Sequence, residues 1–281
     1  MPGILYVVAT PIGNLEDVTL RALRVLRDVT LIAAEDTRRT AKLLQHYSIP
    51  TPTTSLHEHN ERGRTPALIE RLRQGDSIAL VSDAGTPVLS DPGAMLVAAA
   101  HEAGIRVEPV PGPSAALAAL SASGAVSDGF VFVGFAPSRS TARKRWLAGL
   151  AEETRAIVMF EAPHRIRALL SDLEEALGPR IVTVGRELTK MHEELVTQPI
   201  SAHVRTLREA RGEFTLVIHP PAAPESPGIA SHGAVAAGQI RDEFGVLTNN
   251  KAMTRREALR VLSAKHHMPS RDIYKLLEQT K

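Results

Sequence analysis

The feature of this sequence that most constrains its fold is an alternation between short apolar runs and segments with helical spacing. In the first part of the chain, apolar and β-branched runs predict strands over residues 4–9, 29–34, 77–82 and 105–110. Between the first two runs, Leu20, Leu23 and Leu26 recur at helical intervals. Strands that alternate with helices favour a parallel sheet with helices on its faces. The sequence therefore predicts an α/β fold.

Helices are also predicted over residues 65–74 and 93–102. The first of these would carry Pro66 in its first turn, a position that proline tolerates because no amide donor is needed there.

A second cycle of strands and helices begins near residues 111–113. Strands are predicted over residues 130–135, 156–160, 181–185 and 214–219, and helices over residues 139–150 and 163–177. The connections are longer and less regular than in the first part of the chain, so we expect a mixed sheet here.

The end of the chain differs in composition from the rest. Residues 220–228 contain four prolines and predict a linker. Beyond it, short helices are expected over residues 234–244, 255–264 and 271–279, and Thr254 with Glu257 fits a capping box. Residues 251–281 hold eight Lys or Arg against three acids, a balance of +5 within a chain of net charge +2. This basic segment fits either a polyanion contact or a solvated helix face.

Composition excludes several classes of chemistry. The chain has no cysteine, which rules out disulfides, cysteine-ligated zinc, iron–sulfur clusters and a thiol nucleophile. No apolar stretch approaches the ~20 residues that span a bilayer, so we expect no membrane partner. The first residues lack a basic region before an apolar run, and a cytoplasmic protein without a signal peptide is the expectation.

Three loops that follow predicted strands are rich in glycine, proline and acidic residues. They cover residues 10–14, 35–38 and 82–87, and the third continues to residue 93. Ligands of α/β proteins bind at the carboxyl ends of parallel strands. Glycine and proline can also simply end strands, but three such loops in one half of the chain favour a ligand site. The dinucleotide, P-loop and α/β-hydrolase motifs are all missing.

Other polar segments have two interpretations each. His57 and His59 flank Glu58 and could bind metal, but no third ligand is identifiable and an exposed loop is the simpler interpretation. Residues 161–165 fit either an ordinary helix start or a second wall of the cleft. Residues 186–190 fit a solvated turn or an anion-binding rim.

Several of these segments together resemble one known family. The matching stretches are residues 6–15, 35–38, 55–61, 82–87, 111–115 and 161–165. They are similar to the tetrapyrrole methylase superfamily of class III S-adenosylmethionine-dependent methyltransferases. Within it they resemble the family that methylates a cytidine 2′-hydroxyl in 16S ribosomal RNA. The resemblance covers residues 4–220, and the remainder resembles the helical C-terminal appendix of that family.

The resemblance implies two α/β domains, residues 1–112 and 113–222, with S-adenosylmethionine in the cleft between them. The short basic helices of residues 229–281 fit a helix-turn-helix-like appendix, and equally a packing lid or a dimer element. The residues expected to bind the cofactor are Thr10, Pro11, Ile12, Gly13, Asp83, Ala84, Gly85, Thr86, Pro87, Ser114, Ala115, Phe160, Glu161, Ala162, Glu213 and Phe214. In the wider superfamily the first loop is glycine-rich and ends in Asp. The sequence of residues 10–14 departs from that pattern, which argues against a tetrapyrrole substrate.

A ribose hydroxyl is a poor nucleophile near neutral pH, so a general base is expected. The candidates are Glu35, Asp36 and Glu161, with Asp83 and Lys190 as further possibilities; Asp83 is better placed to orient the cofactor. Arg38, Arg39, Arg62, Arg64, Arg165 and Arg186 could contact phosphate.

The resemblance further implies a homodimer that acts on 16S rRNA within the small ribosomal subunit, and nothing in the sequence requires a metal. Two alternatives stay open: methylation of a tetrapyrrole or another small molecule, and a non-catalytic RNA-binding assembly factor.

Overall fold

The computed structural model describes residues 2–126, 128–207, 211–221, 240, 242–250, 253–266, 270, 273, 274 and 277. The chain divides into two compact units, residues 1–221 and 222–281. Each unit is described by itself.

The first half of the larger unit is built on a parallel sheet, as the alternation of strands and helices predicts. Its strands are β1 (Ile4–Val8), β2 (Leu31–Ala34), β3 (Thr53–Ser55), β4 (Ile78–Val81) and β5 (Arg106–Val110). They lie in the order β3-β2-β4-β1-β5, and every neighbouring pair is parallel. β3 was not predicted, because three polar residues carry no apolar pattern.

Helices cover both faces of this sheet. One face packs against α1 (Leu20–Asp28) and α2 (Thr37–His46), and the other against α3 (Glu61–Arg73) and α4 (Ala94–Glu102). A short 3₁₀ turn, η1 (Leu15–Asp17), precedes α1. Because both faces are buried, β2 and β4 consist of buried residues alone and read as continuous apolar runs.

The expected position of Pro66 in a first helical turn was wrong. Helix α3 begins at Glu61, which places Pro66 inside the helix. Proline removes one backbone donor at this point. Pro66 is exposed, so water can reach the carbonyl that loses its partner, and the hydroxyl of Thr65 bonds back to the Glu61 carbonyl at 2.8 Å.

The second half of this unit contains a mixed sheet, as expected. Its strands are β6 (Phe130–Phe135), β7 (Ala156–Glu161), β8 (Ile181–Arg186), β9 (Glu194–Pro199) and β10 (Phe214–Ile218). They lie in the order β6-β7-β10-β8-β9, with β6 and β7 parallel and the other neighbours antiparallel. β9 is an edge strand whose sequence is mainly exposed and mixes polar with apolar residues, so it shows neither an apolar run nor a clear alternation.

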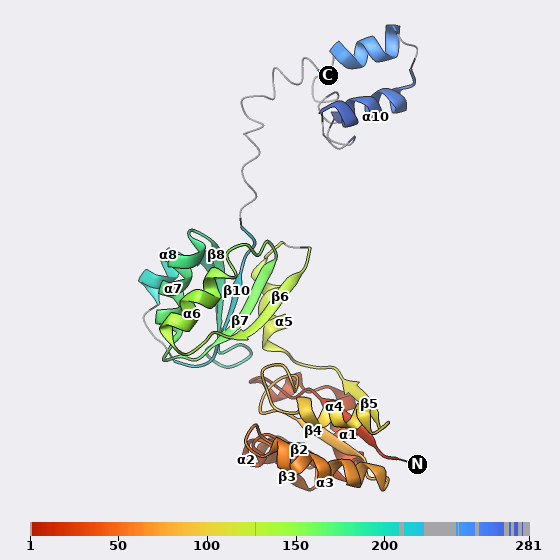
Figure 1. The fold of residues 1–281 in the computed structure, drawn as a ribbon, viewed down its shortest axis with the longest axis vertical. Helices are drawn as coiled ribbons and strands as arrows, with labels where there is room; N and C mark the ends of the chain where they lie inside the picture. The colour runs from red at the N-terminus through yellow and green to blue at the C-terminus, as the bar shows by residue number, and fades with distance from the viewer. Residues whose placement is uncertain are drawn as a thin grey trace. The chain divides into compact units, whose positions relative to one another are not determined.

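Helices also lie on both faces of the second sheet. Figure 1 shows α6 (Ser140–Ala148), α7 (Ile166–Leu177) and α8 (Ile200–Thr206) on one face and α5 (Ala115–Ser123) on the other. The side chains under α6, α7 and α8 form the main core of this half, and a smaller cluster lies under α5.

The smaller unit has its own apolar cluster in its described part. Ile240, Leu262 and Ile273 are almost fully buried there. Helix α10 (Arg255–His266) begins with the predicted capping box, in which the Thr254 amide donates to Glu257 at 2.9 Å and the Glu257 amide donates to the Thr254 hydroxyl at 3.4 Å. A π-helical turn, η2 (Val246–Asn250), precedes it. Most of the predicted helices over 234–244 and 271–279 lies outside the described residues.

Among the residues that the structure describes, no helix has both the length and the apolar character that a membrane crossing requires.

Candidate functional site

A cavity of about 370 Å³ lies at the carboxyl edge of the first sheet and is closed by residues of the second half. Its volume falls within the range of small-molecule sites. The first half contributes loops that follow β1, β2 and β4, whereas the second half contributes strand ends, strand faces and the start of α5.

Two of the predicted loops are joined at one edge of the cavity. The Thr10 amide donates to the Gly85 carbonyl, and the Gly85 amide donates to the Thr10 carbonyl, both at 2.9 Å. The Thr10 hydroxyl also donates to the Ser82 carbonyl at 3.2 Å. Gly85 has a φ of +83°, and a Cβ there would lie 3.2 Å from a methyl group of Ile12. Glycine therefore allows the two loops to approach.

Three carboxylates from the first half line this cavity: Glu35, Asp83 and Asp91. The Asp83 amide donates to Glu35 at 3.1 Å, and the Asp83 carboxylate pairs with Arg39 at 3.2 Å. Burial raises the pKa of the Glu35 carboxyl. Burial, aided by the negative charge of Glu35, raises the pKa of Asp91 to about 6. The Asp91 carboxyl in this wall therefore changes its protonation state close to neutral pH.

The predicted catalytic candidate Asp36 does not line the cavity. Its carboxylate caps α2 by accepting from the Arg38 amide at 2.8 Å, and the Arg38 guanidinium binds the same carboxylate. These hydrogen bonds hold the pKa of Asp36 far below its usual range. Asp36 therefore has a capping function in this structure, while Glu35 and Glu161 lie in the wall.

Four phenylalanines form an apolar wall in the second half. Phe132, Phe135, Phe160 and Phe214 line the cavity, four of the six phenylalanines in the chain. The rings of Phe132 and Phe160 are 5.0 Å apart between centroids, and those of Phe135 and Phe160 are 5.6 Å apart. These spacings are typical of edge-to-face and tilted aromatic pairs.

Glu161 ends β7 in the same wall and is only 1% exposed. One carboxylate oxygen accepts from the Ala162 amide at 2.8 Å and pairs with the Arg165 guanidinium at 3.1 Å. The other oxygen is buried and has no hydrogen-bond partner among the described residues. Because a buried acceptor without a partner is costly, this oxygen is a natural point of contact for a donor on a bound molecule.

Most of the predicted cofactor residues come together in the cavity wall. Those that line it are Ile12, Asp83, Ala84, Gly85, Thr86, Ser114, Ala115, Phe160, Glu161, Ala162, Glu213 and Phe214.

Four predicted residues, Thr10, Pro11, Gly13 and Pro87, are not among the lining residues. Gly13 instead packs against the second half, where a Cβ would lie 2.5 Å from Cγ of Lys190. The neighbouring Asn14 amide donates to the Thr189 hydroxyl at 3.1 Å. The absence of a side chain at Gly13 thus allows this loop to pack closely against the second half.

Sequence reasoning missed several lining residues. They are Arg39 as a wall residue, Ala116, Phe132, Phe135 and Thr215. Leu89, Ser90, Asp91, Pro163 and Leu188 lie in segments that the sequence had marked as candidate site segments, but they were not predicted individually. Asp91 lies in the stretch that continues from the third loop, which is the one signal that could have identified it. Val88 and Ser90 have φ angles of +75° and +69°, a strained conformation that is frequent at functional sites.

The histidine-containing segment before α3 has a structural explanation. The Asn60 side chain accepts from the His57 amide at 2.9 Å and contacts the His57 ring at 3.0 Å. His59 is exposed. Within the described ranges, no group of three or more His, Cys, Asp or Glu side chains could hold a metal ion.

Glu61 in the same segment does not line the cavity but holds one of the cavity loops in place. One of its carboxylate oxygens accepts from the amides of Gly93, Met95 and Leu96 at 3.0, 2.8 and 3.4 Å. Glu61 thereby caps the N-terminus of α4 and fixes the end of the loop that carries Ser90 and Asp91.

The cavity fits S-adenosylmethionine, the cofactor that the resemblance implies. Its lining contains five carboxylates and one guanidinium, a balance that favours a cationic sulfonium. The less exposed phenyl rings of Phe132, Phe160 and Phe214 offer apolar area for an adenine ring. The unpartnered oxygen of Glu161 offers an acceptor for an amino or hydroxyl group.

Comparison with known proteins agrees with this assignment. Residues 4–203 match the family of tetrapyrrole (corrin/porphyrin) methylases. A Synechocystis sp. protein named ribosomal RNA small subunit methyltransferase I is 48% identical over 277 residues, which cover 98% of this chain and 97% of that protein. A protein of the same name from Halalkalibacterium halodurans is 41% identical and covers 99% of this chain and 95% of its own length.

Solved structures share the fold at lower identity. Uroporphyrin-III C-methyltransferase from Thermus thermophilus, complexed with S-adenosylhomocysteine, has a TM-score of 0.56 and 19% identity, covering 77% of this chain and 97% of that chain. A diphthine synthase has a TM-score of 0.61 and 12% identity, covering 77% of this chain and 89% of that chain.

Because the family match spans most of the chain and these relatives align along nearly all of it, the chain belongs to the tetrapyrrole methylase family and, within it, to the S-adenosylmethionine-dependent methyltransferases named ribosomal RNA small subunit methyltransferase I.

Proposed function

We propose that this chain transfers a methyl group from S-adenosylmethionine to the 2′-hydroxyl of a cytidine ribose in 16S rRNA of the small ribosomal subunit. The observation that carries this proposal is an acidic cavity with an aromatic wall in a chain whose full-length relatives bear the name of a small-subunit rRNA methyltransferase. The cofactor supplies an electrophilic methyl group when bound. The chain must position the hydroxyl and accept its proton.

Asp91 is the residue best suited to accept that proton. It lines the cavity, and its pKa of about 6 lies close to a neutral working pH. Glu35 lines the same wall, and its negative charge helps to keep the pKa of Asp91 high. Glu161 is held by Arg165 and is better placed to orient a bound donor. Asp83 is paired with Arg39, which favours an orienting function for it as well.

The charges in and around the cavity favour different parts of a nucleotide. Five carboxylates in the cavity repel a phosphate group, so we expect the ribose to enter while the backbone stays outside. Arg38 and Arg62 are exposed cations on the first turns of α2 and α3, the helices that follow β2 and β3. Such residues suit phosphate contacts that position RNA without specifying its sequence.

A methyl-transfer assay with small ribosomal subunits that lack the modification tests this function. Tritium from labelled S-adenosylmethionine should enter 16S rRNA and appear on a cytidine ribose after digestion. We expect Asp91→Asn to lower kcat by roughly 100-fold or more, the usual contribution of a general base. Glu35→Gln should shift the acidic limb of the pH–rate profile to lower pH, because removing its charge lowers the pKa of Asp91. Label on a base, or no label in rRNA, contradicts the proposal.

The choice between the assembled subunit and free RNA is tested with the same assay. The chain has no RNA-recognition motif of the RRM or KH type. We therefore propose that ribosomal context selects the nucleotide. Faster methylation of the subunit than of deproteinised 16S rRNA supports this, and equal rates contradict it.

We also propose a homodimer that works in the cytoplasm, where ribosomal subunits are found. Apolar side chains of β8, β9 and α8 are exposed and suit a partner surface; they are Ile181, Leu195, Val196 and Val204. Light scattering should give twice the mass of the 30.3 kDa chain, whereas the mass of one chain contradicts the dimer. Cell fractionation should place the protein with the cytoplasmic fraction.

A further inference from the structure

One ring of the aromatic wall is much more exposed than the others. Phe214 is 2% exposed and Phe132 and Phe160 are partly buried, but Phe135 is 51% exposed. Burying a phenylalanine side chain stabilises a fold by roughly 1.5–3 kcal/mol. Because Phe135 is half exposed, the fold gains only part of that stabilisation from it, which suggests that the exposed ring has a function other than packing.

An irregularity in β6 directs the Phe135 ring to the cavity. Phe132 pairs with Val158 and Phe135 with Phe160, so three steps along β6 span two steps along β7. Side chains alternate between the faces of a strand. In a regular strand of the same length, without the bulge, Phe135 would share the face of Val133, which packs in the core under α6 and α7. A bulge of this kind changes the direction of a side chain.

Gly134 holds this bulge in place. It has a φ of +65°, which favours glycine, and a Cβ there would lie 2.9 Å from the hydroxyl of Ser90. Ser90 has positive φ itself and lines the cavity from the other half. Strand β6 and the Ser90 loop therefore meet beside Phe135, and both depart from ordinary backbone geometry there.

We propose that Phe135 stacks on the base of the nucleotide whose ribose enters the cavity; this inference rests on the proposed function and names the part of the substrate that the exposed ring binds. Proteins recognise unpaired RNA by stacking splayed-out bases on aromatic rings. A ribose can enter an enclosed site only when its nucleotide leaves the helical stack. Leu89, also exposed, lines the cavity from the first half and adds apolar area near the ring.

The direct test compares three substitutions by their effect on binding of unmethylated small ribosomal subunits and on KM for them. Stacking contributes enough per base that Phe135→Ala should weaken binding and raise KM by roughly ten-fold or more. Phe135→Leu, which keeps apolar volume but loses the flat ring, should weaken binding nearly as much. Phe135→Tyr should keep parent values. The affinity for S-adenosylmethionine, measured by calorimetry, should change in none of them.

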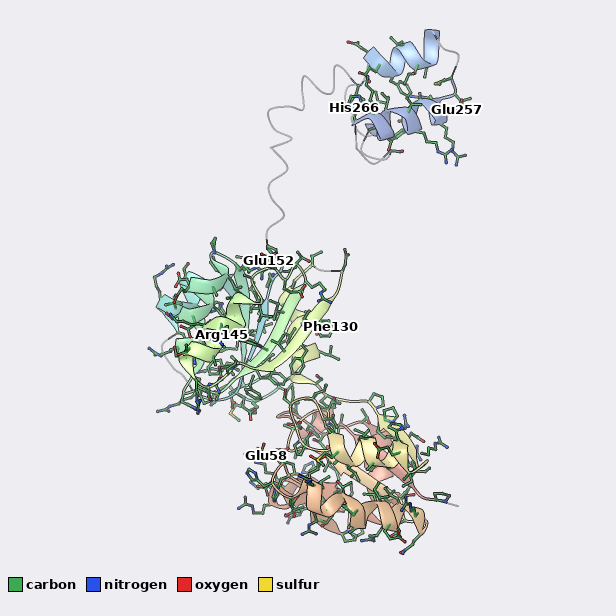
Figure 2. The ribbon with its side chains drawn as sticks, in the orientation of Figure 1. Glu58, Phe130, Arg145, Glu152, Glu257 and His266 are labelled. Atoms are coloured by element: carbon green, nitrogen blue, oxygen red, sulfur yellow. The ribbon has the colours of Figure 1, made fainter. Side chains whose placement is uncertain are left out.

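Phe130 provides a matched control. It is 40% exposed on the same strand, and Figure 2 shows it at the outer side of β6. It does not line the cavity. Phe130→Ala should therefore leave subunit binding, KM and cofactor affinity unchanged.

A reciprocal change in the RNA isolates the contact. In subunits reconstituted with an abasic ribose at the target position, the parent protein should lose the same factor in binding that Phe135→Ala loses with normal subunits. The Phe135→Ala variant should lose little more on the abasic subunits, because the two changes remove one interaction.

Three results overturn the inference. They are unchanged subunit binding in Phe135→Ala, a parallel loss of cofactor affinity, which would assign the ring to the cofactor, and parent behaviour of Phe135→Leu, which would leave only an apolar contact. Failure of the proposed function is distinct from these: the parent would then bind subunits without methylating them, and the binding measurements would still decide whether Phe135 stacks on a base.

Discussion

The two walls of the cavity are built in different ways. The wall from the first sheet consists of loops after parallel strands, and it supplies carboxylates on a backbone in which Gly85, Val88, Ser90 and Gly93 have positive φ. The wall from the second sheet supplies phenyl rings, mainly from strand faces. Loops can direct polar groups at a ligand, whereas strand faces offer flat apolar area. This difference is the basis on which we propose proton transfer at the first wall and base stacking at the second.

The largest effect is expected where the loop wall is supported from outside the cavity. Glu61→Ala removes the acceptor of three amides at the start of α4, of which those of Gly93 and Leu96 are buried. We expect the free energy of unfolding to fall by about 3 kcal/mol, with weaker cofactor binding because the loop of Asp91 loses its anchor. Urea unfolding and calorimetry measure both.

Glu61→Gln serves as the control, because its amide oxygen can still accept. It should lose less than half as much stability. If the alanine variant kept the stability and the cofactor affinity of the parent, the loop wall would be independent of this support.

The next effect concerns the strand wall. Gly134→Ala adds a methyl group at a φ of +65° and 2.9 Å from the Ser90 hydroxyl, so the bulge must shift. We expect a loss of about 2 kcal/mol in the free energy of unfolding, together with a raised KM for small subunits.

Gly104→Ala is the matched control for that substitution. Gly104 has a φ of +68°, but nothing lies within 4 Å of an added Cβ. It should lose about 1 kcal/mol and keep its KM. Equal behaviour of the two variants would show that the contact with Ser90 does not position the aromatic wall.

A smaller effect is expected on the pH dependence of stability, which should involve Asp91 in the loop wall but not Phe135 in the strand wall. The pKa of Asp91 is raised from 3.8 to about 6 in the folded chain, so the folded state binds more protons than the unfolded state between these values. The stability contributed by Asp91 is therefore present below about pH 4 and is lost as the pH rises to 6. Asp91→Asn should be more stable than the parent by ~1 kcal/mol at pH 7.5, after allowance for solvent screening.

The same variant should match the parent at pH 4, which urea unfolding at both pH values can establish. A Phe135→Leu variant should show no such pH dependence relative to the parent. An advantage of Asp91→Asn that persisted unchanged to pH 4 would argue against titration of this carboxylate.

The smallest effect is expected at the rim. Arg62 is exposed in the first turn of α3, so Arg62→Ala should weaken subunit binding by roughly two- to three-fold and lower the salt dependence by roughly one phosphate contact. Arg73 lies at the other end of α3 and pairs with Glu70. Arg73→Ala should have no effect in the same salt titration, and equal losses in both variants would indicate non-specific attraction.

The loop wall was largely predictable from sequence, and the strand wall was not. Glycine, proline and carboxylates after strands are a local signal, which is why Asp83 and Gly85 were predicted together. Phe135 was missed because its direction depends on Gly134, and the conformation of Gly134 depends on contact with Ser90 in a distant part of the chain. Local pattern predicts the strand but not a bulge that tertiary contact selects.

Other differences have similar physical reasons. Asp36 was predicted to be catalytic from its position after β2, but the same position also suits a helix cap, and the Arg38 amide uses it so. Pro66 was assigned to a first turn because the turn residues before it gave no apolar pattern. Leu188 enters the wall through a loop in which Glu187 and Thr189 take left-handed conformations, which no residue type there foreshadows.

Because β6 is bulged, the direction of the Phe135 ring depends on the number of residues between Phe132 and Phe135. Deleting one residue between Phe132 and Phe135 would restore an uninterrupted ladder with β7, and by hydrogen bonding alone the sheet would be more regular. The deletion would keep Phe135 on the cavity face, because two steps along β6 would then match two steps along β7, but it would remove the bulge whose glycine meets the Ser90 loop. Straightening β6 at its present length would instead turn the phenyl ring toward the core under α6 and α7. The bulge and the number of residues between Phe132 and Phe135 must therefore change together if the ring is to keep its direction.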